Sequence, residues 1–573
     1  MKNKELAKIF SRLALYLSMR DIPFRPQAYE RAAFALESLA EDVQDIYKRE
    51  GTAGLEKIQG VGKGIAAHIE EYLKTGKVQN YEKERKRMPV DLDQLTLIEG
   101  VGPKMVAQLY KRLRIRNVQD LEKAASAGKL RKLPGFGVKT EQNILQGIGL
   151  VKRSSGRWRI SDIFPYVQEY VTILKSSSLA KEVEPAGSFR RMRETVGDVD
   201  ILATSKNPKK LIDFFLAKVK YKKIWGKGST KVSIRTQHGF DIDLRVLPEE
   251  TFGAGLQYFT GSKEHNIRLR TFAIEKGYKV SEYGVFTAKG GRRVACRTEE
   301  DVYGALGLPY IEPELREDTG EIEQAMKGKL PKIIPYGSLQ GDLQVQTDWT
   351  DGEHSIEEMA KEAKRQDLSY IAITDHTRDL AMTGGLDEKK LLRQMAEIDR
   401  VQKRVSGIKI LKGAEVNIRK DGTLDIADSA LAKLDVVGVS VHSLFKLPKK
   451  EMTARIVRAM ENPHVDILFH PTGRIIQKRE PYEVDIDAVI RAAKRTGTLL
   501  EINAYPERLD LKDSDIRKAV DAGVTFVIDS DAHRKEHFAV LRYGIAQARR
   551  GWAKASDVAN TLPLAKFLKK LKN

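Results

Sequence analysis

Two pairs of aspartates, each with one residue between its members, are the strongest chemical signal in the chain. Asp198 and Asp200 fall in an apolar stretch that predicts a strand, and Asp241 and Asp243 fall in a second such stretch. Because successive side chains of a strand alternate faces, the members of each pair point the same way. Carboxylates that close repel each other unless a cation lies between them. Three carboxylates on adjacent strands suffice for two Mg²⁺ or Mn²⁺ ions, the arrangement used for in-line phosphoryl transfer.

A glycine-serine turn and a basic loop precede the first pair. Gly187-Ser188 offers backbone N–H groups and a hydroxyl to a phosphate, and Arg190, Arg191 and Arg193 add positive charge beside it. A single aspartate pair is more often an exposed acidic strand. The turn before it and the second pair after it form a rarer combination, which resembles the nucleotidyltransferase superfamily.

The length and composition favour several domains and an anionic partner. At 573 residues the chain is longer than one ordinary domain, and its 41% hydrophobic residues are enough for packed cores. It carries 100 Lys and Arg against 79 Asp and Glu, and +17 of the net charge of +21 lies in the first 335 residues. A basic balance attracts polyanions, of which nucleic acid is the commonest, although such charge also serves solubility alone.

Three classes of protein are excluded or disfavoured by what the sequence lacks. Cys296 is the single cysteine, which excludes a disulfide framework and a cysteine-based zinc site. The chain has no run of 18 apolar residues, and its first residues lack the apolar core of a signal peptide. We therefore expect a soluble, cytoplasmic protein with no membrane partner.

Three similar turns interrupt the first 150 residues, which are helical by the spacing of their apolar side chains. Each turn has the order apolar, any residue, glycine, apolar, glycine, and each leads into a helical stretch. Their glycines are Gly60 and Gly62, Gly100 and Gly102, and Gly135 and Gly137. Glycines let backbone N–H groups approach an anion at the positive end of a helix. One such turn is a common connector, but three in a basic region indicate helix-hairpin-helix motifs that hold DNA phosphates.

The region from 151 to 315 alternates strands and helices. Its predicted strands span residues 182–186, 197–203, 231–236 and 241–247, with a hairpin turn at 237–239 between the last two. A Tyr-Phe-Thr-Gly-Ser stretch at 258–262 then leads into a helix that carries Asn266, Arg268 and Arg270. Taken alone, the two aromatic residues are more simply explained by core packing.

The motifs of this region follow one another in the order known from one family. They are Gly-Ser-Phe-Arg-Arg at 187–191, Gly-Asp-Val-Asp at 197–200, Asp-Leu-Arg at 243–245, Tyr-Phe-Thr-Gly-Ser at 258–262 and Phe-Ala-Ile-Glu-Lys-Gly at 272–277. From about residue 5 to about residue 315 the chain resembles family X DNA polymerases. The resemblance implies a nucleotidyltransferase palm with a thumb and DNA-directed transfer of nucleotides.

The resemblance also implies roles for individual residues. Asp198, Asp200 and Asp243 match the catalytic, metal-binding triad, with Asp243 nearest the primer 3′-hydroxyl, and Asp241 is not expected to be a ligand. The implied reaction is attack of that hydroxyl on the α-phosphate of a dNTP, with two Mg²⁺ or Mn²⁺ ions at the reacting oxygens. The expected nucleotide contacts are Ser188 and Arg191 at the triphosphate, Tyr258, Phe259 and Gly261 at the sugar, Asn266 at the base, Arg270 at the template strand, and Gly197.

The N-terminal region departs from the family at one position. The lyase activity of family X polymerases uses a lysine in the helix after the first hairpin to form a Schiff base, and His68 stands there in this chain. Lys63 is near but belongs to the turn, so the resemblance does not extend to lyase activity. Arg25, Tyr29 and Arg31 still match a site for the 5′-phosphate at a gap. The expected partners are therefore gapped or primer–template DNA and a dNTP.

After about residue 338, short apolar strands recur, each followed by a residue type that binds metals. The acidic, proline-punctuated segment before them, from 309 to 337, predicts a linker that stays out of both cores. Helical stretches separate the strands, which predicts a β/α barrel with its chemistry at the C-terminal strand ends. A single histidine is more often structural, but four histidines and two carboxylates favour a metal centre. These residues are His376, Glu415, His442, His470, Asp531 and His533.

This last part resembles the PHP phosphoesterase domain that follows the polymerase core in bacterial family X polymerases. The resemblance implies a (β/α)7-type barrel, up to three Mn²⁺ or Zn²⁺ ions, and 3′–5′ exonuclease activity. It implies one metal held by Asp351, His376 and His470, and another held by Glu415, His442 and His533. The third metal would take Glu415, Asp531 and two histidines of a first-strand His-x-His.

Glutamine replaces both histidines of that first strand. The predicted strand at 341–347 carries Gln344 and Gln346 at the two positions. A glutamine carbonyl is a neutral oxygen donor and a poor replacement for imidazole at a transition-metal site. We therefore expect two bound metals rather than three, and a nuclease activity that is reduced or lost.

The expected architecture is multidomain, α followed by α/β. It comprises a helical DNA-binding domain at 1–90, a fingers-like helical region at 91–153, a palm at 154–250, a thumb at 251–315, a linker at 316–337 and a PHP domain at 338–573. The expected function is the filling of short gaps in DNA repair, such as base excision repair. The alternatives left open are an active 3′–5′ exonuclease or AP-endonuclease PHP domain, a non-catalytic scaffold that binds DNA ends, and an RNA-directed nucleotidyltransferase. The aspartate triad disfavours the scaffold, and the three hairpins favour DNA.

Overall fold

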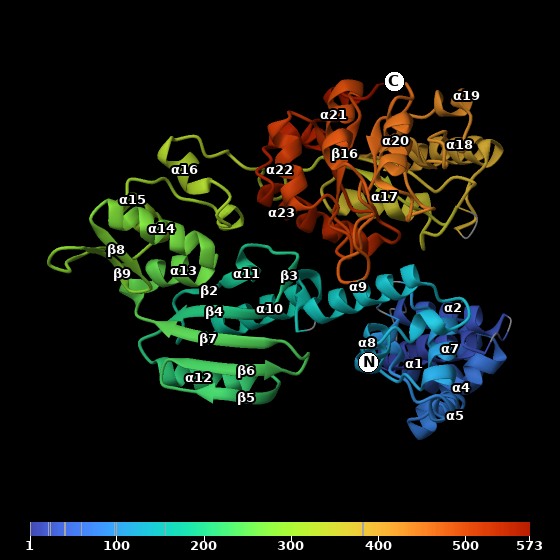
Figure 1. The fold of residues 1–573 in the computed structure, drawn as a ribbon, viewed down its shortest axis with the longest axis horizontal. Coiled ribbons are helices and arrows are strands. Elements are labelled where there is room, and N and C mark those ends of the chain that lie inside the picture. The colour runs from blue at the N-terminus through green and yellow to red at the C-terminus, as the bar shows by residue number, and fades with distance from the viewer. Residues whose placement is uncertain are drawn as a thin grey trace. The chain divides into compact units, whose positions relative to one another are not determined.

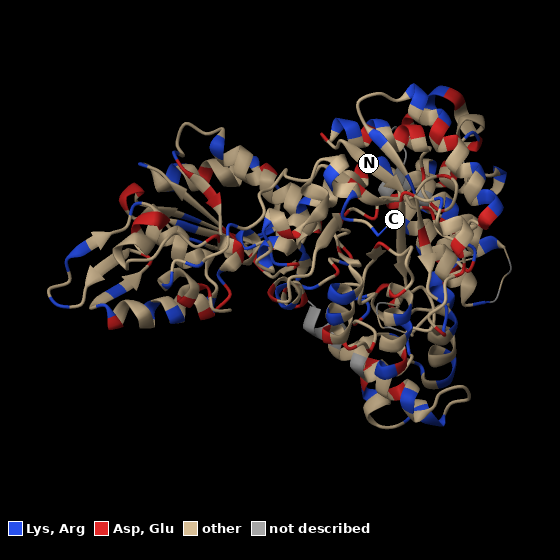
Figure 2. Ribbon diagram, turned by 90° about the horizontal axis from the view of Figure 1, so that it is seen from above, with Lys and Arg blue, Asp and Glu red and all other residues tan. Residues whose placement is uncertain are grey.

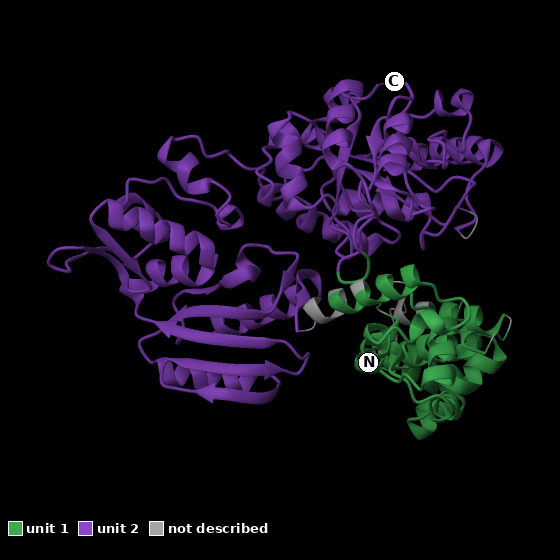
Figure 3. Cartoon of the chain, viewed as in Figure 1, with its two compact units in different colours: residues 1–155, 477–479 green, residues 156–476, 480–573 purple. Residues whose placement is uncertain are grey.

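The computed structural model describes residues 2–572, apart from residues 21, 23, 39–41, 59, 97, 99, 155, 381 and 382. They form two compact units, one of residues 1–155 with 477–479 and one of residues 156–476 with 480–573 (Figure 3). Lys and Arg occur together with Asp and Glu in every part of the ribbon (Figure 2). None of the described helices combines the length and apolar character that crossing a bilayer requires.

The first unit is helical, as predicted. Its helices are α1 (Lys2–Ser18), α2 (Arg25–Ser38), α3 (Val43–Glu56), α4 (Lys63–Thr75), α5 (Gln79–Arg87), α6 (Leu92–Leu95), α7 (Pro103–Leu113), α8 (Val118–Ser126) and α9 (Val138–Ser154). One apolar cluster runs through them, and Phe10, Leu13 and Leu17 of α1 are fully buried at helical spacing. Each such side chain stabilises the fold by about 1.5–3 kcal/mol when it leaves water.

The second unit begins with a five-stranded palm sheet in the order β2–β4–β7–β6–β5. The strands are β2 (Val183–Pro185), β4 (Asp198–Thr204), β5 (Tyr221–Lys227), β6 (Lys231–Thr236) and β7 (Asp241–Leu247), with a two-stranded ribbon of β1 (Trp158–Arg159) and β3 (Thr195–Val196) beside it. Helices α10 (Ile160–Lys175) and α12 (Pro208–Lys218) cover one face, where Val199 and Ile201 are buried (Figure 1). The other face is left for the polar residues of β4 and β7.

The predicted palm strands are confirmed, and one strand was missed. Residues 231–236 and 241–247 form strands with the predicted bounds, and Gly239 N donates to Thr236 O in the turn between them. The missed strand is β5, which lies at the edge of the sheet. Its residues are exposed except for the partly buried Ile224, and three of them are lysines, so they show no alternation of apolar and polar side chains.

The thumb follows the palm. It consists of α13 (Phe252–Thr260), α14 (Lys263–Glu275), the antiparallel strands β8 (Tyr278–Ser281), β9 (Gly284–Thr287) and β10 (Arg293–Ala295), and α15 (Glu299–Ala305). Short helix α11 (Gly187–Arg190) of the palm contacts α13.

The prediction that residues 309–337 stay out of both cores is wrong. Ile311, Leu315 and Ile322 are buried in the thumb cluster, and the segment contains helix α16 (Glu321–Met326). Arg316 is fully buried with its Nη1 2.5 Å from Glu299 Oε1. The segment looked like a linker because its few apolar residues are spread among acidic ones, whose arginine partners lie far along the chain.

The last part of the chain is a parallel barrel of seven strands in sequence order. They are β11 (Gly341–Val345), β12 (Tyr370–Ile373), β13 (Lys409–Asn417), β14 (Val436–Ser440), β15 (Ile467–Leu468), β16 (Leu499–Asn503) and β17 (Phe526–Asp529). A parallel bridge between Val345 and Ala532 brings the last strand back to the first. The predicted (β/α)7-type barrel is confirmed, although β16 was not predicted and Glu415 lies inside β13 rather than after it.

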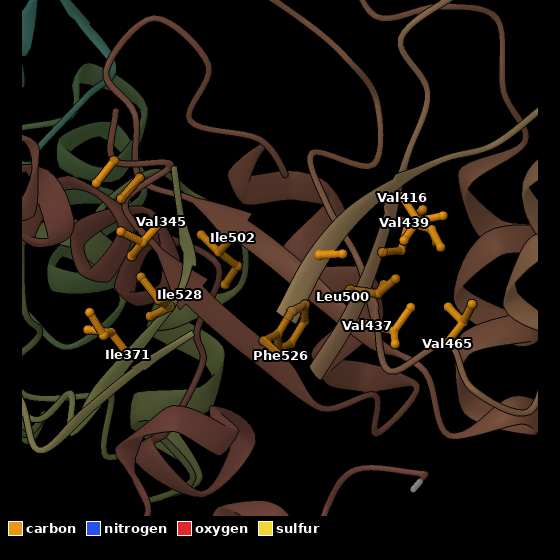
Figure 4. Packing of buried hydrophobic residues seen from close by; sticks show 14 of the residues in the cluster. Val345, Ile371, Val416, Val437, Val439, Val465, Leu500, Ile502, Phe526 and Ile528 are labelled. Atoms are coloured by element: carbon orange, nitrogen blue, oxygen red, sulfur yellow. The ribbon is translucent and has the colours of Figure 1, made fainter. Parts of the chain in front are cut away.

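Helices surround the barrel and share its main apolar cluster. They are α17 (Ile356–Arg365), α18 (Glu388–Arg404), α19 (Asp428–Leu431), α20 (Lys449–Met460), α21 (Ile486–Thr496), α22 (Asp513–Asp521) and α23 (Leu541–Arg550). Helix α24 (Leu564–Leu568) packs instead on a second apolar cluster, where its Phe567 contacts Tyr370 of β12. Alternate strand residues such as Ile371, Val439 and Ile502 point into the main cluster (Figure 4). The strand residues between them are therefore free to carry polar groups at the strand ends.

Candidate active sites

The palm brings the predicted aspartates together. Strands β4 and β7 are parallel neighbours, and their register pairs Asp198 with Asp241 and Asp200 with Asp243. All four carboxylates therefore lie on the sheet face opposite α10 and α12. Burial, together with the charges of Asp198 and Asp243, raises the pKa of Asp200 to about 6 against the attraction of Arg245. Such a cluster of oxygen donors suits Mg²⁺ or Mn²⁺.

Two basic side chains lie against these carboxylates. Lys231 Nζ of β6 is 2.6 Å from Asp243 Oδ2. Arg245, two residues after Asp243, is 3.3 Å from the same oxygen through Nη2 and 3.5 Å from Asp200 Oδ1 through Nε. These cations partly balance the cluster. Both side chains are long and partly exposed, so they can move when a metal ion binds.

The structure separates Asp241 from Asp243, which the sequence pattern could not do. Asp241 accepts hydrogen bonds from Arg235 Nε at 2.5 Å, Arg235 Nη2 at 2.8 Å and Trp225 Nε1 at 3.0 Å. The hydrogen bonds from Arg235 hold the pKa of Asp241 below its ordinary value. Asp241 is thus committed to a neighbouring arginine, whereas Asp243 faces Asp200.

The turn at Gly187 lies directly beside the aspartates. Gly187 has φ of 64° and begins α11, and a Cβ atom there would lie 3.5 Å from Asp200 Oδ2. Ala186 N donates to Asp200 O at 2.8 Å, which ties the turn to β4. The turn therefore holds Ser188 next to the carboxylates. Gly197, the residue before β4, has Arg157 Nη1 3.5 Å from the place of a Cβ atom.

Arg191, the predicted triphosphate contact, is fixed by two acceptors. Its Nε donates to Glu317 Oε1 at 3.0 Å, and its Nη1 donates to Thr260 O. A Cβ atom on Gly261 would lie 3.0 Å from Arg191 Nη1. Glycine at 261, with φ of 71°, thus leaves room for the guanidinium group.

The side chains predicted to contact the sugar and the base differ in the partners that they already have. Phe259 lies under Arg245, whose guanidinium carbon is 4.5 Å from the ring centroid, and Tyr258 packs edge-on against Phe259. Asn266 is buried, and its amide is bonded within the thumb to Gln257 Nε2 at 2.8 Å and to Tyr258 O at 2.7 Å. Arg270 is exposed on α14.

The three hairpin turns of the first unit share one backbone geometry. The first glycine of each turn, Gly60, Gly100 or Gly135, has φ of 84°, 81° or 83°. The second glycine directly precedes a helix: Gly62 precedes α4, Gly102 precedes α7 and Gly137 precedes α9. No described atom lies within 4 Å of a Cβ built on any of these second glycines. The helix N-termini are therefore open to an anion.

A basic pocket of about 690 Å³ opens at the first of these turns. Its polar lining includes Arg25, Arg31, Lys57, Lys63 and His68, with Tyr29 beside them. The His68 ring lies 6.1 Å from that of Tyr29, and His68 Nδ1 is 3.2 Å from Glu71 Oε2. The pocket thus unites the three residues predicted to hold a 5′-phosphate with both residues compared for lyase chemistry.

The barrel gathers the predicted metal ligands into two groups, in a different pairing from the predicted one. One group is Asp351, His376 and His533, and the other is His376, Glu415 and His442. His533 Nε2 and His376 Nε2 lie 3.6 and 3.7 Å from Asp351 Oδ2. His470 was expected beside Asp351, but its Nε2 lies 2.9 Å from Glu415 Oε1. The predicted places of His470 and His533 are thus exchanged.

The two glutamines meet at one oxygen of Glu415. Gln344 Nε2 donates to Glu415 Oε2 at 3.0 Å, and Gln346 Nε2 donates to the same atom at 2.9 Å. Gln344 Oε1 accepts from Asn503 Nδ2 at 3.1 Å, and Asn503 Nδ2 also lies 3.2 Å from Asp531 Oδ2. Both glutamines and Glu415 are fully buried. Two amide donors therefore stand where a cation would otherwise balance this carboxylate.

The donor sets fit metals at the two groups but not at the glutamines. His376 belongs to both groups, and its ring nitrogen Nδ1 is buried without a hydrogen-bond partner among the described residues, as a site built for cations would leave it. Glu415 Oε2, by contrast, already accepts from two neutral amide N–H groups, while Gln346 Oε1 is buried without a partner among the described residues. Asp531 Oδ2 likewise lies 3.3 Å from Arg508 Nε.

Comparisons with known proteins agree with this geometry. Residues 1–78 match the helix-hairpin-helix domain, 92–149 the SAM-like helix-hairpin-helix tandem, 255–317 the DNA polymerase beta thumb and 342–504 the PHP domain. The chain is 37% identical to the DNA polymerase/3′–5′ exonuclease PolX of Bacillus subtilis over 98% of both chains. The chain belongs to the PolX-type family X DNA polymerases.

Two further relatives match parts of this polymerase. DNA polymerase lambda of Arabidopsis thaliana is 25% identical over 55% of the chain and 62% of its own length. A probable phosphatase of Thermoanaerobacter sp. is 34% identical over 31% of the chain and 72% of its own length. The family X core and the PHP domain thus each have counterparts in separate proteins.

Several residues of these sites escaped the sequence analysis. Lys231 and Arg245 lie in strands that were predicted, and the alternation rule already placed them on the carboxylate face. Asn503 ends β16, where Glu501 is buried beside it. The apolar pair Leu499-Leu500 before Glu501 was the signal that could have found this strand.

Proposed function

We propose that this family X polymerase fills short gaps in DNA by transferring a nucleotide from a dNTP to a primer 3′-hydroxyl. The observation that carries the proposal is the register of β4 and β7, which sets Asp200 beside Asp243 with Asp198 on the same face. In this proposal Asp198, Asp200 and Asp243 bind two Mg²⁺ or Mn²⁺ ions. When bound, such ions stabilise the attacking and leaving oxygens of an in-line displacement.

The protein groups around the triad have separate roles in this proposal. The backbone at Gly187-Ser188 and the Arg191 guanidinium hold the triphosphate, and Tyr258 and Phe259 pack against the sugar. Arg270, exposed on α14, contacts the template strand. Because the Asn266 amide is already bonded to Gln257 and Tyr258 O, it acts on the base only if one of those bonds opens.

The basic pocket at α4 is proposed to hold the 5′-phosphate of the gap. Arg25, Arg31 and Lys63 supply the charge, and the N-terminus of α4 adds N–H donors. Lys63 is the first residue of α4, so the prediction that it belongs to the turn is wrong, but His68 still stands at the position of the family's Schiff-base lysine. The other two hairpins are proposed to hold DNA phosphates without regard to sequence.

The PHP domain is proposed to be a weakened nuclease. Asp351, His376, His442, His533 and Glu415 retain ligand groups for two Mn²⁺ or Zn²⁺ ions. The corner of Gln344 and Gln346 offers only neutral amide oxygens in place of imidazole, and both amides donate to Glu415 Oε2. The division into domains at 90, 153, 250, 315 and 337 is part of the same proposal, with the segment after 315 folded onto the thumb.

A second candidate is an active 3′–5′ exonuclease in the PHP domain. The two complete ligand groups favour it, because two metals suffice for many phosphoester hydrolyses. The two candidates differ only in whether the third position is needed.

One experiment tests both activities. A labelled primer on a one-nucleotide-gapped, 5′-phosphorylated duplex is incubated with Mn²⁺, with and without dNTP. Extension by one nucleotide is expected, and its absence would raise the scaffold alternative. Without dNTP an intact primer is expected, and a shortened primer would establish the active exonuclease.

The 5′-phosphate site is tested on the same substrate with and without the phosphate. Lys63→Met is expected to lower extension of the phosphorylated gap by about tenfold, because one charge-assisted contact is lost. It should leave the 5′-hydroxyl substrate unchanged. Lys74→Met, in the last turn of the same helix and paired with Glu70 at 2.5 Å, is the matched control.

A further inference from the structure

A chain of buried ion pairs links Arg191 of the palm to helix α23 of the barrel. Glu317 accepts from Arg191 Nε at 3.0 Å and from Arg550 Nη1 at 2.9 Å. Arg550 Nη1 also lies 3.1 Å from Arg191 O, and its Nη2 donates to Asp513 of α22. Arg550 is 2% exposed, so it has no other role at the surface.

The charges of this cluster leave a surplus beside the nucleotide site. Three guanidinium groups, those of Arg191, Arg193 and Arg550, face two carboxylates, those of Glu317 and Asp513. Burial opposes ionisation of Glu317, but the guanidinium groups outweigh it and hold its pKa below the ordinary value. The cluster is therefore fully charged, and its net charge of one positive unit suits an anionic ligand at Arg191.

Apolar packing joins the same two regions behind the glycine-serine turn. Phe189, next to Ser188 on α11, stacks on Phe164 of α10 with ring centroids 5.3 Å apart. Tyr543 of α23 packs edge-on against Phe164 at 6.0 Å. Tyr543 and Ala546 belong to the palm's own apolar cluster. Helix α23 thus supports both ends of the segment from Ser188 to Arg191.

We propose that Arg550 of the barrel is a positioning residue for the polymerase reaction, because it fixes Glu317 and the backbone of Arg191 and so holds the Arg191 guanidinium ready for a nucleoside triphosphate. The proposal rests on the proposed role of Arg191 as a triphosphate contact. It gives the barrel a function in nucleotide binding that does not depend on hydrolysis.

The hydrogen bonds of Arg191 explain why Arg550 acts on it through Glu317. Arg191 uses Nε for Glu317 and Nη1 for Thr260 O, which leaves Nη2 as the donor for a ligand. Both acceptors must stay in place for that donor to keep its direction. Glu317 lies among three cations, and without Arg550 it would keep Arg191 and Arg193 as partners and lose its anchor on the barrel. Preorganised donors bind more tightly because less order is lost on binding.

The test compares two adjacent arginines of α23. Arg550→Met is expected to raise the KM for dNTP by about 5- to 20-fold, because a charge-assisted contact at Arg191 is weakened. The kcat and the KM for gapped DNA should change by less than about threefold, since the loss is one of ground-state binding. Arg549→Met is the matched control: Arg549 is also buried and pairs with Glu314 at 2.7 Å, away from Arg191. Its KM for dNTP should stay that of the parent.

A double-mutant cycle shows whether Arg550 acts through Arg191. Arg191→Ala alone is expected to raise the KM for dNTP by about 10- to 100-fold. Adding Arg550→Met to it should raise the KM by less than about twofold more, because coupled residues are not additive. Multiplying effects would overturn the proposal. An unchanged KM in Arg191→Ala would overturn the role of Arg191 itself, a distinct failure.

A milder variant covers the case in which Arg550→Met does not fold. Glu317→Gln keeps the shape of the side chain and removes the charge between the two arginines. The proposal expects the KM for dNTP to rise, by about three- to tenfold. A fall in KM would overturn it, because it would mean that Glu317 competes with the triphosphate for Arg191.

Discussion

The palm aspartates and Glu415 of the barrel have the same charge but opposite kinds of partner. Asp243 lies against Lys231, whose long, flexible side chain is 40% exposed. Oxygen Oε1 of Glu415 faces His442 and His470, but Oε2 accepts from Gln344 and Gln346, which are neutral and fully buried. A cation on a flexible stem gives way to a metal ion, whereas two amides fixed in a core do not. The two carboxylates therefore differ in whether their neighbours have room to move aside.

The largest effect is expected from the palm. Asp243→Asn should lower gap extension by roughly a thousandfold, because a metal ligand worth several kcal/mol is lost. Asp241→Asn is the matched control on the same strand and face, and it should change extension by less than about threefold, since Asp241 is committed to Arg235. Single-turnover extension measures both. Equal losses in the two variants would contradict the distinction between the two aspartates.

The contrast at Glu415 is tested by replacing the two neighbouring glutamines with histidines. The double variant Gln344→His with Gln346→His should bind one more metal ion per chain and degrade the primer about 10- to 100-fold faster without dNTP. Elemental analysis after dialysis against Mn²⁺ measures the first effect and a labelled primer the second. Glu415→Gln added to the double variant should remove the gain. A double variant with unchanged metal content would mean that the glutamines are not what excludes the ion.

Asp466 is a buried carboxylate of the barrel whose hydrogen bonds come from backbone N–H groups. It accepts from Val437 N and Lys572 N, both at 2.9 Å, yet burial raises its pKa to about 6 from 3.8. A raised carboxyl pKa means that stability is lost as pH rises from about 4 through 6. The difference between the two pKa values corresponds to about 3 kcal/mol of unfolding free energy. An asparagine at this position would lose one hydrogen-bond acceptor, which is worth about 1 kcal/mol.

Asp466→Asn should therefore raise the free energy of unfolding by about 1–2 kcal/mol at pH 7.5. Below about pH 4 the gain should vanish, because the carboxyl group is then neutral in both states. Urea unfolding at the two pH values measures the change. The same gain at both would show that charge is not its cause.

The smallest effect is expected for Lys231, the lysine that lies against Asp243 in the palm. Lys231→Met should tighten Mn²⁺ binding to the DNA-free protein by about two- to fivefold, because an exposed ion pair of at most about 1 kcal/mol no longer competes. Calorimetric titration measures the affinity. Lys227→Met, which removes the pair of Lys227 with Asp213 at 2.6 Å, should leave it unchanged. Weaker Mn²⁺ binding in Lys231→Met would mean that the lysine supports the site rather than competing.

How far the sequence predicts these sites depends on how local the signal is. Strands β6 and β7 were predicted with their bounds because apolar and polar residues alternate in them and a glycine turn separates them. The two aspartate pairs followed, because residues two apart on one strand share a face, but the choice of Asp243 over Asp241 came from the family resemblance and not from the spacing. Strand β5 escaped because it lies at an edge where six of its seven residues are exposed.

The ligand pairing in the barrel escaped for a different reason. The predicted histidine ligands and Asp531 do follow strands, whereas Glu415 lies inside β13, but which of them meet depends on the closure of seven strands into a ring, which no local pattern encodes. The burial of Arg316 depends likewise on Glu299. Such long-range ion pairs decided that residues 309–337 fold onto the thumb rather than link two domains.

The apolar cluster that Tyr543 and Ala546 share with Phe164 and Phe189 has a consequence for how such a chain changes over generations. Deleting the barrel would bare the back of the turn that begins at Gly187. Over generations, substitutions elsewhere in the barrel can accumulate without disturbing this contact, whereas loss of the whole barrel would expose apolar side chains of the palm.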